Sequence, residues 1–130
     1  MPRAYTIATA ALALDMSTKW LDNTLSHHRI AGVVQHRQGV ARRLTVDGLL
    51  ILSMALALTK ELSATVAGAI NIAQKLVAAG GVYVSPDGMR IELDLEAFRT
   101  RLLARLEVAV EAAPLPRRGR PPKNTTGRLD

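Results

Sequence analysis

The sequence contains no cysteine, few aromatic residues and no apolar run long enough to cross a membrane. The absence of cysteine excludes disulfide bonds and thiolate metal sites, and it is typical of proteins in a reducing compartment. Because aromatic residues make up only 3% of the chain, Leu, Ile, Val and Ala must fill the core. The longest apolar run, residues 49–58, is broken by Ser53 and is about half of a ~20-residue membrane span. With no signal peptide in view, we expect a cytoplasmic protein of bacterial or phage origin that has no membrane partner.

Acidic residues are also missing from one stretch, so the net charge of +6 is unevenly distributed along the chain. Residues 23–46 hold four arginines and no acid, and residues 114–130 hold five basic residues and one acid. The rest of the chain is nearly neutral. Scattered charge would serve solubility equally well, whereas two separate basic regions favour a polyanionic partner.

The opening segment, "YTIATAALALDMSTKWLDNTLSHH", predicts two short helices joined by a tight turn. Thr6 is a suitable N-cap for the first helix, whose periodicity stops at Asp15. Ser17 is a suitable N-cap for the second helix, over residues 17–27, with Trp20 in its buried stripe. The exposed face of that helix would carry Thr18, Lys19, Asp22, Asn23 and Ser26. The pattern is that of a helix-turn-helix, and the alternative is an ordinary helical hairpin.

A basic hairpin is predicted directly after these helices, in "RIAGVVQHRQGVARRLTV". Strands at about 30–35 and 40–44 would flank a polar tip in which Gly39 adopts a positive φ. Arg37 at the tip, together with Arg42 and Arg43 on the second strand, would make this hairpin a wing that contacts phosphates beside the groove.

The centre of the chain predicts two further helices. The first begins at Thr45 and Asp47 and is apolar almost all round, so we expect it to be the most buried helix. We expect Ser63 to cap the next helix and Gly80-Gly81 to end it.

After these helices the sequence predicts a second hairpin and a last helix. "SPDG" at 85–88 is a strong turn signal, and Asp94 would cap a helix reaching about Ala113. That helix would close the core or pair with its copy in a dimer. The fold class is therefore mainly α with small β-hairpins, in three parts: residues 1–79, 80–113 and a disordered basic tail over 114–130.

The residues from Tyr5 to about Ala79 resemble the DNA-binding domain of the MerR family. The likeness is carried by "YTIATAALALDMSTKWL" and by "RRLTVDGLLIL", where the wing ends and an acidic cap starts the next helix. The resemblance implies a winged helix-turn-helix that binds an inverted repeat as a homodimer. Ser17, Thr18 and Lys19 would then lie at the DNA groove, and Arg42 and Arg43 would contact the DNA phosphate backbone. "WLDNT" departs from the Leu-Arg-Tyr-Tyr usual in that family.

The tail resembles an AT-hook through "PRRGRPPK". A narrow A·T minor groove has enhanced negative potential that attracts Arg. Gly119 removes the side chain that would clash with the groove floor, and Pro121 helps to keep the backbone extended. A generic solubilising tail is the alternative.

The complete set of DNA-binding candidates follows from these two resemblances and from the charge pattern. It comprises Ser17, Thr18, Lys19, Asn23, Arg29, Arg37, Arg42, Arg43, Arg117, Arg118, Gly119, Arg120, Pro121 and Lys123. His27, His28 and His36 lack an accompanying carboxylate or thiol, so they favour phosphate or solvent contact over a metal.

The sequence shows no motif of an enzyme, and no cofactor is expected. The leading hypothesis is a dimeric, nucleoid-associated regulator or repressor that binds double-stranded DNA. One alternative is an antitoxin or adaptor that binds a protein partner through residues 82–113. The other is an architectural or recombination-accessory protein that bends DNA.

Overall fold

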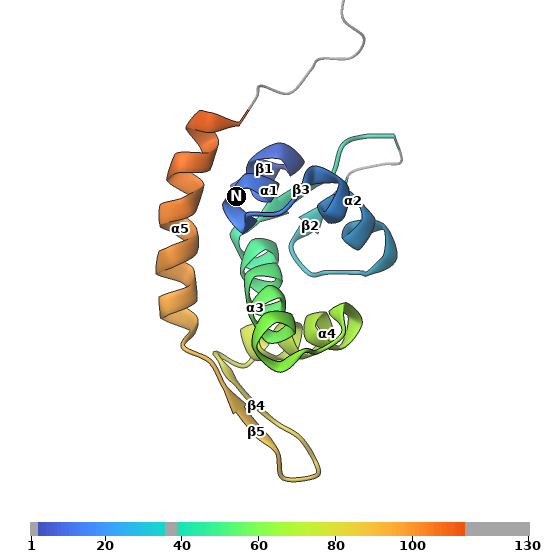
Figure 1. Cartoon of the computed structure of the whole chain (residues 1–130), viewed down its shortest axis with the longest axis vertical. Coiled ribbons are helices and arrows are strands. Elements are labelled where there is room, and N and C mark those ends of the chain that lie inside the picture. Colours follow the sequence, from blue (N-terminus) through green and yellow to red (C-terminus); the bar gives the residue numbers. More distant parts are fainter. Residues whose placement is uncertain (1–2, 36–38, 114–130) are drawn as a thin grey trace, which may run out of the picture.

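The computed structural model describes residues 3–35 and 39–113 and is mainly helical (Figure 1). Its helices are α1 (Ile7–Leu14), α2 (Thr18–His27), α3 (Val46–Leu62), α4 (Val66–Ala78) and α5 (Leu95–Ala112). A three-stranded antiparallel sheet has the order β1-β3-β2, with β1 at Ala4–Thr6, β2 at Val33–Val34 and β3 at Arg43–Thr45. A separate hairpin pairs β4 (Val82–Val84) with β5 (Arg90–Glu92). The predicted class, mainly α with small antiparallel hairpins, is confirmed.

Helix starts follow the local sequence closely. The hydroxyl of Thr6 accepts a hydrogen bond from the Thr9 amide, and that of Ser17 accepts one from the Trp20 amide. The N-cap predicted at Asp94 is confirmed. At the start of α3 the cap is Thr45, whereas Asp47, the acidic cap that the resemblance implied, lies in the first turn. Thr45 and Asp94 each accept from the amide three residues on. A capping side chain satisfies an amide that no helical carbonyl can reach, which explains why these boundaries can be predicted from sequence.

The cap expected at Ser63 is wrong. Ser63 has a φ of 55° and ends α3, whereas Thr65 begins α4 and accepts from the Gly68 amide at 3.1 Å. An N-cap needs an extended backbone, and Thr65 has it with φ −69° and ψ 155°. Ser63 and Thr65 both carry a hydroxyl suited to capping, so residue type alone did not distinguish them.

The strands expected at 30–35 and 40–44 are shorter than predicted, and the second lies further along the chain, at 43–45. β3 pairs with β2, as Val33 lies opposite Leu44, and also with β1, as Ala4 lies opposite Thr45. The pairing with β1 was not predicted. It joins segments about forty residues apart, and no local pattern marks such a contact.

α3 is the central element of the core. Leu49, Leu50, Leu52 and Met54 on it are fully buried, as expected for a helix that is apolar almost all round. α4 packs on one side of it, while α5 lies along α1 and α3 (Figure 1). α5 buries Leu102, Leu106 and Ala109, so the last helix closes the core.

Two further features bear on the surface. The β4–β5 hairpin projects from the end of the molecule where α4 ends and α5 begins (Figure 1). Within residues 3–35 and 39–113, none of the helices combines the length and the apolar character that a membrane crossing requires.

Candidate nucleic-acid interface

α2 presents a continuous polar face. Its exposed residues include those predicted from the sequence, namely Thr18, Lys19, Asp22, Asn23 and Ser26. Leu21, Thr24 and Leu25 are buried on the other side and hold the helix against the core. Because residues three and four apart share a helix face, Lys19, Asp22, Asn23 and Ser26 form a strip that a partner could reach as one surface.

The turn between α1 and α2 sets the direction of this face. Asp15 adopts the left-handed conformation with φ 58° and ψ 43°, and its amide donates to the carbonyls of Ala11 and Leu12. The next amide, of Met16, donates to Ala11 at 2.9 Å. Aspartate tolerates this conformation better than most residues, although glycine is better suited to it.

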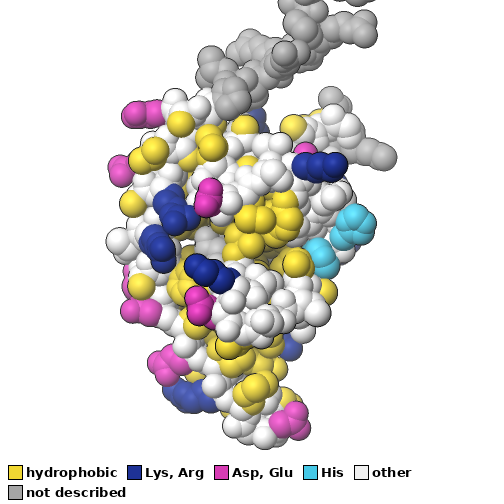
Figure 2. All heavy atoms as spheres, in the orientation of Figure 1, with side chains coloured by type: hydrophobic (Ala, Val, Ile, Leu, Met, Phe, Trp, Pro, Cys, Tyr) yellow, Lys and Arg dark blue, Asp and Glu magenta, His cyan; other side chains and the backbone are white. Residues whose placement is uncertain are grey.

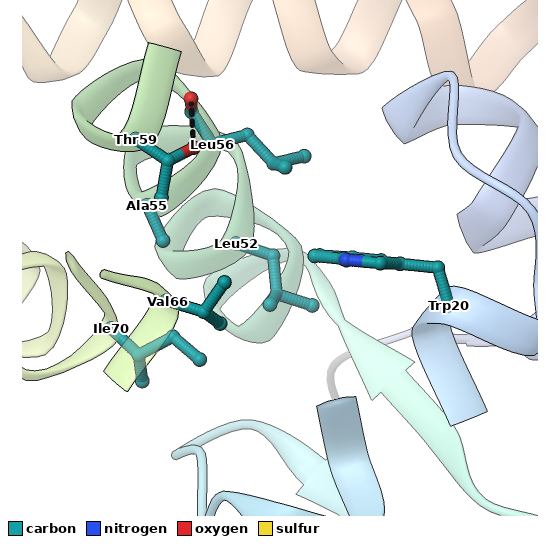
Figure 3. Close-up of a pocket in the computed structure, with 7 residues that line it drawn as sticks. All are labelled: Trp20, Leu52, Ala55, Leu56, Thr59, Val66 and Ile70. Carbon is teal, nitrogen blue, oxygen red and sulfur yellow. Dashed lines mark hydrogen bonds between the residues drawn. The ribbon is translucent and has the colours of Figure 1, made fainter. Parts of the chain in front are cut away.

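Trp20 attaches α2 to the rest of the core. Its ring extends from α2 toward Leu52 on α3 (Figure 3), and it lines a shallow apolar depression together with Leu56 and Val66. The cavity there has a volume of only about 10 Å³. That is room for about one water, so the depression is a packing feature and not a ligand pocket.

Arg42 lies beside the polar face of α2. Its Nη1 donates to the Ser26 hydroxyl at 3.4 Å, and that hydroxyl donates to the Asp22 carbonyl at 2.8 Å. The next residue, Arg43, is exposed on β3, while Leu44 is fully buried. Because side chains alternate between the two faces of a strand, Arg43 points outward while its neighbour Leu44 packs into the core. The structure brings Arg42 to the same surface as α2.

A side chain bridges the two described ends of the loop that joins β2 to β3. Gln35 Nε2 donates to the carbonyl of Val40 at 2.8 Å. Gly39 has the positive φ predicted for it, 89°, and no atom of the described residues beyond its chain neighbours lies within 4 Å of where its Cβ would be. The candidate Arg37 lies between these residues but outside the described part of the chain, as do Arg117, Arg118, Gly119, Arg120, Pro121 and Lys123 of the tail.

Arg29 is positioned by a contact that sequence reasoning missed. Gln74 of α4 donates through Nε2 to the Arg29 carbonyl at 3.2 Å and accepts at Oε1 from the Ala31 amide at 3.1 Å. Its side-chain amide thus pairs with the backbone of a segment 43 residues earlier. A side-chain amide can donate and accept at once, which suits it to hold an irregular segment. No local signal identifies this pairing.

Gly32 and Gly48 make a second unpredicted contact, where the segment after α2 crosses the start of α3. A Cβ on Gly32 would lie 2.4 Å from the Gly48 nitrogen, and Gly32 has a φ of 88°. The Gly32 carbonyl accepts from the Thr45 amide at 2.8 Å and from the Thr45 hydroxyl at 3.0 Å. These contacts dock residues 28–34 on the N-terminus of α3. They fix the segment that follows α2, which includes Arg29 and β2, against the start of α3.

Replacing Gln74 by leucine is expected to lower the free energy of unfolding by about 1–2 kcal/mol, because two hydrogen bonds to the backbone are lost. Hydrogen exchange of the Ala31 amide should accelerate at least as strongly as the stability falls, since Gln74 is its acceptor. Asn71→Leu is the control, because Asn71 is exposed on the same helix. If the exchange rate of the Ala31 amide is unchanged in Gln74→Leu, Gln74 does not hold this segment in place.

The charge around α2 is mostly positive. Lys19 lies on α2, Arg29 directly follows it and Arg42 contacts it, and Asp22 is the one acid in the sequence of residues 17–46. Figure 2 shows histidine side chains at the end of α2, on the right of the view, whereas most acidic side chains visible there lie over α5 and around the β4–β5 hairpin. His27 Nδ1 is 2.8 Å from the Asn23 carbonyl, so this nitrogen donates. Among the described residues, no three His, Asp or Glu side chains are grouped to hold a metal ion.

Comparisons with known proteins identify no relative of this chain. The chain matches no family model, no curated protein and no solved structure.

Proposed function

We propose that this chain is a sequence-specific double-stranded DNA-binding protein, a divergent MerR-like winged helix-turn-helix that regulates transcription. α2 would read the major groove and the tail would read an A·T minor groove. The observation that carries the proposal is the contact of Arg42 with Ser26, because it puts a cation of the β2–β3 segment on the exposed polar face of α2. Base-reading side chains beside phosphate-binding cations are what groove recognition requires.

The arrangement around α2 supports the same proposal. α1, the turn at Asp15, α2 and the β2–β3 loop follow one another in the order of a winged helix-turn-helix. Arg29 follows α2 directly and Arg42 contacts its polar face, and cations there would orient the helix on the duplex. Their phosphate contacts would make affinity fall steeply with salt.

The test is a selection from random double-stranded DNA with the full chain at two salt concentrations. A two-fold symmetric motif with half-sites a whole number of turns apart, about 10.5 base pairs each, would support the regulator. Salt-sensitive binding without a motif, with a preference for A·T-rich DNA, would instead support an architectural or recombination-accessory protein.

Replacing Arg120 by alanine is expected to weaken binding about tenfold on sites with A·T-rich flanks and to have little effect on G·C-rich flanks. The reason is that A·T steps have no guanine amine to obstruct an arginine in the minor groove. Fluorescence anisotropy on paired duplexes measures this, with Arg128→Ala as the matched tail control. A loss of equal size for both kinds of flank would remove the AT-hook from the proposal.

A second candidate function, an antitoxin or adaptor, is favoured by the projecting β4–β5 hairpin. Val84 and Met89 on it are 57% and 55% exposed, so the hairpin presents apolar surface that a protein partner could cover. Purification of the tagged full chain from its native host distinguishes the two. A stoichiometric protein partner that is lost in Val84→Ser with Met89→Ser would favour the adaptor.

A further inference from the structure

α5 retains exposed apolar side chains after it has closed the core. Leu103 and Val110 are 42% and 39% exposed, and they lie two turns apart on one flank of the helix. Together with Tyr5 of β1 they line a groove beside α5 whose volume is about 590 Å³. This groove and its lining are called the α5 groove below.

Two carboxylates line the α5 groove where a helix favours positive charge. Glu111 lies in the last turn of α5 and Glu107 lies one turn before it, and both are exposed. The last turn contains no basic residue. Because the dipole of a helix places negative partial charge at its C-terminus, a cation bound there is stabilising. The ion pairs formed among residues 3–35 and 39–113 involve neither carboxylate, so both are available to a cation from outside that part of the chain.

We propose that the α5 groove binds the chain's own C-terminal tail, residues 114–130, when no DNA is present. The tail has five basic residues and one acid, and it also has an apolar residue, Leu115, near its start. Arg117 and Arg118 pair with the two carboxylates, and Leu115 covers Val110. The tail thus supplies both the cations and the apolar surface that the α5 groove can accept.

The described end of the chain lies at the groove. The C-cap of α5 is Ala113, two residues after Glu111, and its backbone is extended with φ −71° and ψ 143°. Glu107 lies six residues before Ala113, about 9 Å back along the helix axis. Arg117 is four residues beyond Ala113 and can therefore lie up to about 13 Å from it. The tail is long enough to turn back along α5 and bring its first arginines to both carboxylates.

Arg3 lines the α5 groove from the start of the chain and opposes the tail. Its guanidinium carbon lies 4.9 Å from the centroid of the Tyr5 ring, and this contact keeps it at the groove. One cation against two carboxylates leaves the groove with a net negative charge, so a basic segment is favoured over an acidic one. Removing this cation by Arg3→Gln should strengthen the docking.

Docking withholds the tail from DNA. Arg117 and Arg118 belong to "PRRGRPPK", the segment proposed to enter an A·T minor groove, and they cannot contact the α5 groove and DNA at once. This consequence rests on the proposed function, whereas the docking itself does not.

Paramagnetic broadening in the full chain without DNA tests the docking. The chain has no cysteine, so Pro122→Cys provides a single site for a nitroxide on the tail. We expect the methyl signals of Leu103 to broaden more than those of Val108. Val108 is the matched control, because it is 69% exposed, does not line the groove and is nearer to the tail in sequence. A tail that is not docked would broaden Val108 more.

Charge variants test the pairing. Glu107→Gln with Glu111→Gln should reverse the order of broadening. Glu61→Gln with Glu96→Gln is the control, because it removes the same charge from two exposed residues outside the groove lining. Thermal melts check that each variant is folded.

Affinity for an A·T-rich duplex separates the docking from the proposed function. If docked chains make up about four fifths of the population, Glu107→Gln with Glu111→Gln should raise this affinity about fivefold more than the control pair does. Selective broadening of Leu103 without such a rise establishes the docking and contradicts the proposed role of the tail on DNA.

Three results overturn the docking. The first is a Val108 signal that broadens at least as strongly as that of Leu103 in the parent chain. The second is an order of broadening that Glu107→Gln with Glu111→Gln leaves unchanged. The third is broadening of Leu103 in isotope-labelled chains without a nitroxide when they are mixed with nitroxide-labelled chains, which assigns the groove to the tail of another copy.

Discussion

Gly32→Ala is expected to lower the free energy of unfolding by about 3–5 kcal/mol, the largest loss that we expect from any single methyl group in this protein. Two effects combine. A φ of 88° is unfavourable for any residue with a Cβ, and the new methyl carbon would lie 2.4 Å from the Gly48 nitrogen and 2.5 Å from the Thr45 hydroxyl. The close atoms belong to the backbone and to a capping side chain, so neither can move without loosening the start of α3.

The two effects can be separated, because Gly39 has the same backbone conformation without the crowding. Its φ is 89°, and within the part of the chain that the structure describes nothing but its chain neighbours lies within 4 Å of its Cβ position. Gly39→Ala should therefore cost only about 1–2 kcal/mol, the penalty of the left-handed conformation alone. Urea denaturation of both variants measures the difference. Equal losses would show that the Gly32–Gly48 approach contributes nothing beyond the backbone strain.

Gly32→Ala should also affect DNA binding at temperatures where the protein remains folded. The Gly32 carbonyl accepts both hydrogen bonds from Thr45, and the segment that it docks carries Arg29 and β2. If the methyl group pushes this segment away from α3, Arg29 loses its fixed position. We expect weaker binding with a smaller salt dependence, because a phosphate contact is lost.

Replacing Lys19 and Asn23 together by alanine is expected to reduce the preference for the selected site over random DNA by about a hundredfold, while non-specific affinity changes only a few fold. The two side chains are one helical turn apart on the exposed face of α2, where a helix in the major groove would meet base edges. Each well-formed base contact contributes about 1–3 kcal/mol to discrimination. Alanine favours the helix, so stability should be preserved.

The chain provides a matched control on another helix. Asn71 and Lys75 of α4 are the same residue types at the same spacing, and both are exposed. Lys75 lies 5.0 Å from the Tyr83 ring centroid, a contact that contributes about 0.5–1 kcal/mol at an exposed site. Asn71→Ala with Lys75→Ala should leave discrimination intact. If discrimination survives in the α2 variant and falls in the α4 variant, the reading helix is α4 and the proposed placement of α2 is wrong.

The parts of the candidate site that could be predicted from sequence are those that depend on neighbours along the chain. The polar face of α2 follows from Ser17 as its cap and from the periodic burial of Leu21 and Leu25. Arg43 could be expected on the surface because Leu44, its neighbour on a strand, is apolar. The tail residues lie outside the described part of the chain, so their role stays a prediction.

The rest of the site depends on pairings between distant segments. Nothing near Gln74 in the sequence marks its role, and only its position against residues 29–31 lets it hold that segment. The crossing of Gly32 over Gly48 and the contact of Arg42 with Ser26 belong to the same class. A wrong choice between Ser63 and Thr65 is a smaller error of a similar kind, because the conformation of the α3–α4 turn decided it.

The sequence by itself determined the helices, most of their caps, the buried stripes and the turn at 85–88, because each rests on interactions between residues a few positions apart. The tertiary structure decided that β1 joins β3, that α5 closes the core over α1 and α3, that Arg42 contacts α2 and that Gln74 holds residues 29–31. The physical reason is that local interactions depend on spacing, which is written in the chain. Contacts between distant segments depend on which apolar faces are buried together, and many arrangements compete for the same faces until the whole core has formed.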